Sequence, residues 1–158
     1  PEAQLDRFLF KLEVGYPAEA QEKHAVMAHC SSAGMPDLDA LGVEAVLDLQ
    51  QVDALRAMSA SVRIEPDLAG YAVALARATR SHGSFDVGLS PRAATMLAAA
   101  ARGAAACEGR DFVVPDDIKG LFVPLSRHRV VLSTTAEMEG VGADRVLQEI
   151  LQTVPAPR

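Results

Sequence analysis

The chain opens on an alternation of apolar and polar residues between Leu5 and Val14. One side of this stretch carries Phe8, Phe10, Leu12 and Val14, and the other carries Leu9, Lys11 and Glu13. A repeat of two residues predicts a β-strand, and the turn-forming sequence Gly15-Tyr16-Pro17 predicts its end. A single strand is not stable alone, and no partner of similar length follows. We therefore expect its sheet to lie outside this sequence, or the strand to pair with a second copy.

The rest of the chain has the spacing of α-helices. Helices are predicted at Glu19–Cys30, at Leu49–Ser61, from Pro66 to about Ser81, from Ser90 to about Cys107, over a short segment from Pro115, and at Asp144–Val154. Extended pieces are expected at residues 62–64, 112–114 and 127–132, and a loop at residues 31–42. The pattern predicts a mainly α protein with five to six helices, preceded by one isolated strand.

Apolar stripes identify the helix faces that we expect to be buried. The stripe of the third helix consists of Leu68, Tyr71, Ala72, Leu75, Ala76 and Thr79. The stripe of the last helix consists of Val146, Leu147, Ile150, Leu151 and Val154. Nine of the fourteen residues from Ala93 to Ala106 are alanine, so the helix that contains them should pack closely at the centre.

Composition and charge narrow the class of protein. Hydrophobic residues make up 49% and charged residues 23%, and no apolar run approaches the roughly 18 residues of a membrane span, so no membrane insertion is expected. The net charge of −6 and the scattered basic residues argue against nucleic-acid binding. Cys30 and Cys107 lack metal-binding spacing, and His24 and His29 are poorly spaced as ligands. We expect no metal site, and two reduced, half-buried thiols in a cytoplasmic protein.

Several short motifs occur in a distinctive order. They are Pro1-Glu2-Ala3-Gln4-Leu5-Asp6-Arg7-Phe8, Ala78-Thr79-Arg80, Gly88-Leu89-Ser90-Pro91-Arg92-Ala93, the stretch from Glu108 to Ile118, and Arg127-His128-Arg129. In this order and at these spacings they resemble the MoxR family of AAA+ ATPases over nearly the whole chain. The resemblance implies that residues 1–16 end the ATPase core with its arginine-finger strand, and that residues 17–158 form the helical lid domain. The opening at Pro1, without a start methionine, fits a C-terminal fragment of such a protein.

The resemblance implies a catalytic role for Arg7. In AAA+ rings an arginine beside the last core strand reaches the ATP of the neighbouring subunit, and Arg7 matches that position. A guanidinium supplied in trans offsets the negative charge that gathers on the γ-phosphate during phosphoryl transfer. On the residues alone, Arg7 could equally pair with Asp6 or lie at the end of a strand.

Arg92 matches the second-sensor arginine of the lid, which implies contact with the β- and γ-phosphates of ATP in the same subunit. The residues themselves point the same way. Ser90 and Pro91 place Arg92 in the first turn of a helix, where a cation is unfavourable for the helix dipole and an anion is attracted. The alternative is a solvated arginine without a ligand.

A second basic group has a role that the sequence leaves open. It consists of Arg110, Arg127, His128 and Arg129. These residues could line the phosphate side of the lid, or they could form salt bridges to Asp111, Asp116 or Asp117, which we favour. Val114 and Gly142 stand where the family often has threonine, so side-chain capping of two helices should be lost.

For the full-length protein, the resemblance implies ATP and magnesium as cofactors, and hydrolysis by a homo-oligomeric ring, such as a hexamer. It implies chaperone-like remodelling of protein complexes. The lid would contact its own ATPase core and neighbouring subunits, and von Willebrand A-domain proteins are possible partners. This sequence lacks a phosphate-binding loop and a strand that ends in Asp-Glu, so the fragment alone should be inactive and hold no cofactor.

Two other hypotheses stay open. The chain could be a non-enzymatic helical protein-interaction module, which a gene without a phosphate loop would support. It could also be the lid of a magnesium-chelatase-like or helicase-like AAA+ subunit. For the isolated strand, we expect disorder, exchange with another copy, or non-native pairing with the lid.

Overall fold

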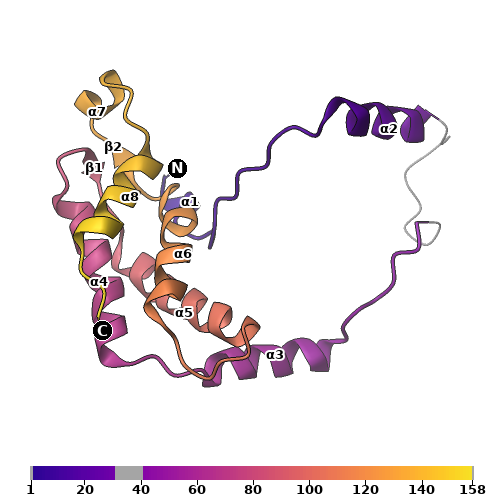
Figure 1. The fold of residues 1–158 in the computed structure, drawn as a ribbon, viewed down its shortest axis with the longest axis horizontal. Coiled ribbons are helices and arrows are strands. Elements are labelled where there is room, and N and C mark those ends of the chain that lie inside the picture. Colours follow the sequence, from indigo (N-terminus) through magenta and orange to yellow (C-terminus); the bar gives the residue numbers. More distant parts are fainter. Residues whose placement is uncertain (1, 31–40, 158) are drawn as a thin grey trace. The chain divides into compact units, whose positions relative to one another are not determined.

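The computed structural model describes residues 2–30 and 41–157, and Figure 1 shows its ribbon. Two compact units are present. The first contains Pro1–Leu12 and Ala54–Arg158, and the second contains Glu13–Asp53. Helix α3 (Leu49–Ser61) runs from the second unit into the first.

The first unit is helical. It contains α1 (Glu2–Leu5), α4 (Pro66–Ser81), α5 (Pro91–Cys107), α6 (Pro115–Ser126), α7 (Thr134–Met138) and α8 (Ala143–Thr153). Helix α5 packs against both α4 and α6, and α8 packs against α4 and α6 (Figure 1). The prediction of a mainly α fold is confirmed. With α7, seven helices follow residue 17 in the described part of the chain, one more than predicted.

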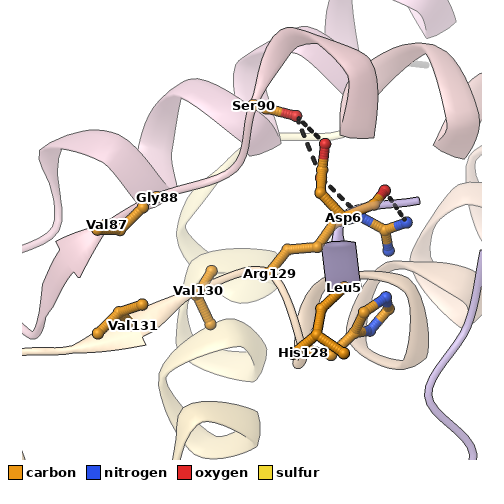
Figure 2. A pocket seen from close by; sticks show the side chains of 9 residues that line it. All are labelled: Leu5, Asp6, Val87, Gly88, Ser90, His128, Arg129, Val130 and Val131. Atoms are coloured by element: carbon orange, nitrogen blue, oxygen red, sulfur yellow. Dashed lines mark hydrogen bonds and ion pairs between the residues drawn. The ribbon is translucent and has the colours of Figure 1, made fainter. Parts of the chain in front are cut away.

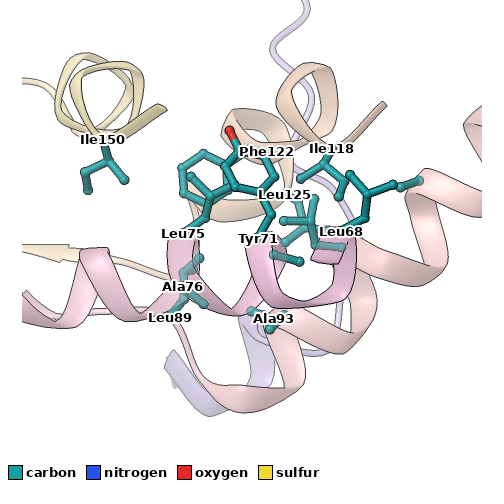
Figure 3. Close-up of a cluster of buried hydrophobic side chains, with 14 of the residues drawn as sticks. Leu68, Tyr71, Leu75, Ala76, Leu89, Ala93, Ile118, Phe122, Leu125 and Ile150 are labelled. Atoms are coloured by element: carbon teal, nitrogen blue, oxygen red, sulfur yellow. The ribbon is translucent and has the colours of Figure 1, made fainter. Parts of the chain in front are cut away.

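The core forms where the apolar stripes predicted it. All six residues of the α4 stripe are buried, and so are Val146, Leu147 and Ile150 of α8. Figure 3 shows Leu75 and Tyr71 of α4 beside Phe122 and Leu125 of α6. The apolar faces of three helices therefore meet in one cluster.

Helix α5 is central because alanine lets its neighbours approach. Its buried residues are Ala93, Ala94, Leu97, Ala101 and Ala105. The helix begins as predicted, since the Ser90 hydroxyl accepts a hydrogen bond from the backbone N–H of Ala93 at 3.3 Å and Pro91 occupies the first turn. In the C-terminal half of α5, the Arg102 side chain donates a hydrogen bond to the carbonyl of Val62 at 2.8 Å.

Short extended segments join the helices. Strand β1 (Phe85–Val87) pairs antiparallel with β2 (Val131–Leu132), and Arg63 forms a parallel bridge with Phe112. The segments predicted at residues 62–64, 112–114 and 127–132 are thus confirmed in part by these pairings. Strand β1 has no counterpart among the predictions, because three residues of mixed polarity carry no detectable repeat.

The second unit contains α2 (Glu19–Cys30) and the first turns of α3. No residue of α2 is buried. Asp48 and Gln51 cap the start of α3 reciprocally, because the Gln51 N–H donates to the Asp48 carboxylate at 2.7 Å and the Asp48 N–H donates to the Gln51 side chain at 2.8 Å. Most of the loop predicted at residues 31–42 lies outside the described residues.

Two predictions are wrong. The segment Leu5–Val14 is not a strand, because α1 ends at Leu5, turns follow to Leu9, and no strand is assigned over the rest of this segment. The thiols of Cys30 and Cys107 are free but exposed rather than half-buried. The division of the chain into residues 1–16 and 17–158 stays a prediction. No helix within residues 2–30 or 41–157 is long and apolar enough to cross a membrane.

Candidate functional site

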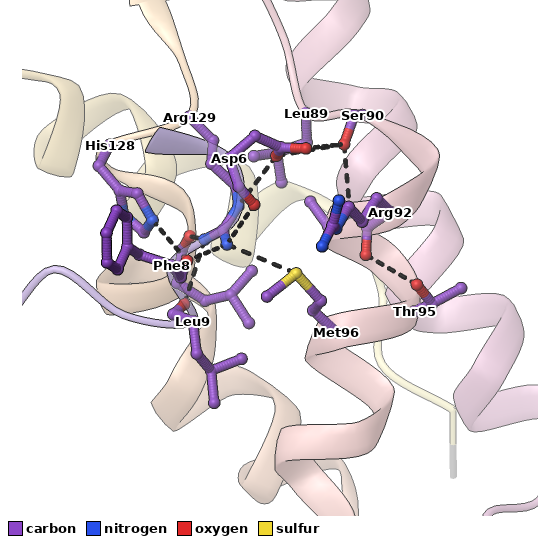
Figure 4. Close-up of polar contacts among 12 residues, drawn as sticks. Asp6, Phe8, Leu9, Leu89, Ser90, Arg92, Thr95, Met96, His128 and Arg129 are labelled. Carbon is purple, nitrogen blue, oxygen red and sulfur yellow. Dashed lines mark hydrogen bonds and ion pairs between the residues drawn. The ribbon is translucent and has the colours of Figure 1, made fainter. Parts of the chain in front are cut away.

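The N-terminus of α5 presents a solvent-exposed arginine. Arg92 occupies the first turn, where the free N–H groups of the helix favour an anion over a cation. Its side chain forms no ion pair within residues 2–30 and 41–157. In Figure 4 the guanidinium points toward Asp6 and Arg129. The site therefore combines a helix N-terminus with an unpaired positive charge.

A second arginine beside this site is buried and fully engaged. The side chain of Arg129 is 1% exposed, and its Nε donates to the Asp6 carboxylate at 3.1 Å. The guanidinium also donates to the backbone carbonyls of Asp6 and Leu9, each at 3.1 Å, and to those of Phe8 and Leu125. Figure 4 shows these bonds converging on one side chain. Arg129 therefore fastens residues 6–9 to the end of α6.

Burial and neighbouring charges act on Arg129 in opposite directions. Burial lowers the pKa of the guanidinium, the Asp6 carboxylate raises it, and the nearby positive charge of Arg92 lowers it again. Arginine keeps its proton under all ordinary conditions. Burial is the main cause of the lowered pKa, and the repulsion between Arg92 and Arg129 adds a smaller part, which an anion bound between them would relieve.

Asp6 connects Arg129 with α5. The Ser90 hydroxyl lies 3.3 Å from each carboxylate oxygen of Asp6 and donates to them, while it also caps the helix. Asp6 thereby bridges Ser90, the cap that precedes α5, and Arg129, which lies in the turn after α6. On the residues alone Asp6 was a possible partner of Arg7, but its partners in the structure are Arg129 and Ser90.

Arg7 lies in the turn that Arg129 holds. Its backbone N–H donates to the carbonyl of Gln4 at 3.4 Å, and its residue is exposed. As with Arg92, the side chain makes no ion pair among the described residues. The structure therefore brings the backbones of the two predicted site residues into one region, through the contact of Asp6 with Ser90.

His128 adds a contact to the same turn. Its Nε2 lies 3.0 Å from the carbonyl oxygen of Phe8, which can only accept, so Nε2 carries the proton. Burial lowers the pKa of His128, and the positive charges of Arg129 and Lys11 lower it further, although the Phe8 carbonyl and Asp6 act in the other direction. His128 is therefore a neutral donor at pH 7.

A cleft and an apolar groove border the turn. The cleft has a volume of about 320 Å³ and opens between β1, β2 and the turn, with Asp6, Ser90 and Arg129 on its wall (Figure 2). The groove has a volume of about 490 Å³ and runs along α5, where Leu9 and Phe10 lie opposite residues that include Met96 and Cys107. Both depend on residues 5–10 for one wall.

The other basic residues form ion pairs within the lid. Arg110 binds Asp117 through two hydrogen bonds at 2.9 and 2.6 Å, and Arg127 lies 2.6 Å from Asp144. The Asp117 carboxylate also accepts the N–H of Val114, whereas Val114 makes no side-chain cap of its own at the start of α6, as expected. For Arg110, the favoured salt-bridge interpretation is confirmed, with Asp117 as the partner. Gly142 begins α8 without a side-chain cap, as expected.

Arg129 is the residue of this region that the sequence left undefined. Its partner Asp6 is 123 residues away, so no local spacing could pair them. The one sequence signal for burial of Arg129 was its position directly before an apolar run, which predicts that the chain enters the core at this point. A buried arginine requires a carboxylate.

Comparison with known proteins agrees with this geometry. Residues 77–150, which contain Arg92, Arg110 and Arg129, match the AAA lid domain family. A crystal structure of a candidate ATPase from Cytophaga hutchinsonii superimposes with a TM-score of 0.84 at 29% identity, covering 100% of this chain and 49% of that one. Residues 77–150 therefore have the fold of a AAA+ lid, and the chain as a whole superimposes on part of an ATPase structure.

Sequence relatives specify the family. The chain is 35% identical to the chaperone MoxR1 of Mycobacterium tuberculosis, over 100% of this chain and 42% of that protein. It is 36% identical to YeaC of Bacillus subtilis, over 99% of this chain and 48% of that protein. The chain belongs to the MoxR family of AAA+ ATPases. It spans just under half the length of these curated relatives.

Proposed function

We propose that this chain is the lid part of an ATPase that hydrolyses ATP to remodel protein complexes, and that Arg92 binds the phosphates of the nucleotide. The observation that carries the proposal is the exposed, unpaired guanidinium of Arg92 in the first turn of α5. A cation there opposes the helix dipole and lies close to a buried arginine. An anion bound between them would remove both penalties.

A nucleotide phosphate suits this position for two reasons. Free N–H groups at a helix N-terminus attract phosphate, and a planar guanidinium can bind two phosphate oxygens at once. The AAA lid match supplies the expected context, since it includes α5. We propose that ATP and magnesium are held by an ATPase core outside this sequence, and that Arg92 contacts the β- and γ-phosphates from the lid of the same subunit.

Arg7 completes the proposal as an arginine finger. Its exposed side chain projects from a turn whose backbone is bonded to the lid. In a ring of like subunits it would reach the nucleotide of the neighbouring subunit and offset charge on the γ-phosphate in the transition state. The chaperone name of the M. tuberculosis relative supports protein remodelling as the output. Von Willebrand A-domain proteins stay proposed partners, and the cytoplasm is the proposed location.

The first test measures ATP turnover and nucleotide affinity in the full-length protein. Arg92→Ala should weaken nucleotide binding and turnover at least about tenfold, because a charge-assisted phosphate contact is lost. Arg7→Ala should lower kcat by about 10³-fold with little effect on binding, as finger residues act in the transition state. Arg145→Ala is the control, since this exposed arginine of α8 pairs with Glu149 of the same helix. Unchanged turnover in both Arg7 and Arg92 variants would contradict the proposal.

A mixing experiment assigns each arginine to a subunit. Arg7→Ala subunits, inactive for lack of a finger, are combined with subunits whose phosphate loop is disabled. Activity that returns on mixing shows that Arg7 acts in trans. For Arg92→Ala the same mixture should stay inactive if Arg92 serves its own subunit, and recovery there would overturn that assignment.

A further inference from the structure

The turn of residues 6–9 is attached to the lid by polar bonds more than by apolar burial. Leu5, Phe8 and Leu9 are 49%, 65% and 40% exposed, so hydrophobic contact holds them weakly. By contrast, three backbone carbonyls and one carboxylate of this turn accept hydrogen bonds from Arg129. One guanidinium thus makes four of the polar bonds that hold the turn, beside those from Ser90 and His128.

The position of Arg7 follows from these bonds. Arg129 holds the carbonyls of Asp6 and Phe8, the residues on either side of Arg7. Arg7 itself makes no side-chain bond that could fix it within residues 2–30 and 41–157. The backbone of Arg7 is therefore held by hydrogen bonds at the residues before and after it, and its side chain stays available for a ligand.

The same bonds link Arg7 to the helix of Arg92. Arg129 binds the Asp6 carboxylate, which accepts the Ser90 hydroxyl at 3.3 Å, and Ser90 caps α5 two residues before Arg92. A displacement of α5 by a phosphate at Arg92 would act on Asp6 first and then on the turn. A bound phosphate would also act on Arg129 electrostatically, because the positive charge of Arg92 already repels that of Arg129.

We propose that Arg129 is a positioning residue that couples the two exposed arginines, so that the state of the lid at Arg92 sets the position of Arg7. This rests on the proposed ATPase function and extends it to a residue that touches neither nucleotide. Binding of nucleotide at Arg92 would then change the position of Arg7, which serves the nucleotide of the neighbouring subunit. A misplacement of about 1 Å can lower a catalytic rate by about 100-fold.

The test is a double-mutant cycle on kcat in the full-length protein. Arg129→Gln keeps polar donors but loses the fork and the charge, and should lower kcat at least about tenfold while the KM for ATP changes less than about threefold. In an Arg7→Ala background the same substitution should change kcat by less than about twofold, because its effect passes through Arg7. A merely structural role would lower kcat equally in both backgrounds, and that result would overturn the proposal.

Controls separate this proposal from the one on which it rests. Arg110→Gln also breaks a two-bond arginine–carboxylate pair of the lid but touches no residue of the turn, so kcat should stay within about twofold of the parent. If Arg129→Gln does not fold, Asp6→Asn replaces it, since the carbonyl bonds to Arg129 remain while the charge pair and its link to Ser90 weaken. Asp6→Asn must show the same dependence on Arg7.

If Arg7→Ala alone has no effect, the finger assignment fails. If Arg7→Ala lowers kcat and Arg129→Gln lowers it further by the same factor in that background, the finger assignment stands and only the proposed coupling through Arg129 is contradicted.

Discussion

The hydroxyl of Ser90 serves Ala93 and Asp6 at the same time, accepting from the backbone of one and donating to the carboxylate of the other, each at 3.3 Å. The hydroxyl thus combines a helix cap with a contact to a segment 84 residues away in sequence. The start of α5 and one contact of the N-terminal turn therefore share one oxygen atom.

Replacement of this oxygen should have a measurable cost. Ser90→Ala removes the cap and a donor to Asp6, so the free energy of unfolding should fall by about 1–2 kcal/mol. Urea unfolding followed by circular dichroism measures it. Ser81→Ala is the control, because that hydroxyl only donates to carbonyls of its own helix at 3.3 and 3.4 Å. An equal decrease in the free energy of unfolding in the two variants would show that the helix cap and the Asp6 contact of Ser90 do not add to stability.

The two faces of α4 should differ sharply in their tolerance of truncation. Leu75 is 0% exposed and Val73 is 48% exposed on the same helix. Leu75→Ala leaves a cavity among α4, α6 and α8 and should cost about 2–5 kcal/mol. Val73→Ala should cost less than about 0.5 kcal/mol. Thermal or urea unfolding compares them, and similar losses would mean that this core is assigned wrongly.

Gly88 should accept no side chain. A Cβ atom there would lie 2.6 Å from the backbone N and Cα of Arg80 and 2.7 Å from the carbonyl carbon of Thr79. Because all three atoms belong to the α4 backbone, Gly88→Ala must push the segment before α5 away from α4 and should cost more than about 1 kcal/mol. At Gly83 no atom lies within 4 Å of the added Cβ, so Gly83→Ala is the matched control. A Gly88→Ala protein as stable as the parent would refute the close approach.

His128 should make stability depend on pH near neutrality. Its folded-state pKa lies below the ordinary value of 6.5, mainly through burial, and its Nδ1 is buried without a partner in the described part of the chain. The unfolded chain therefore binds a proton more readily, so this contribution is present above pH about 6.5 and is lost as the pH falls toward the folded-state pKa. His128→Gln keeps a donor for Phe8 and should reduce the loss of stability between pH 7 and 5.5. Urea midpoints at both pH values test this, and identical pH dependence in the two proteins would count against it.

The sequence predicted the helices well where a single face is buried. Leu75 and Ile150 recur in stripes with the helical period, and Ser90 and Pro91 form a local start signal, so neighbouring residues were enough. Neither the short strand β1 nor the pairing of Arg129 with Asp6 could be found this way, because each depends on partners far along the chain. The carbonyls that would have joined a sheet at residues 6–9 bind a guanidinium instead, which explains why alternation alone misled.

The exposed thiol of Cys107 makes the groove along α5 accessible to observation. Cys107 lines it together with Leu9 and Phe10, and its sulfur is free. After Cys30→Ser, Cys107 is the one cysteine left in this sequence, and a fluorophore or spin label attached to it would lie beside residues 9 and 10. The molecule thus contains its own reporter position, from which departure of the N-terminal turn could be followed in real time without an engineered cysteine.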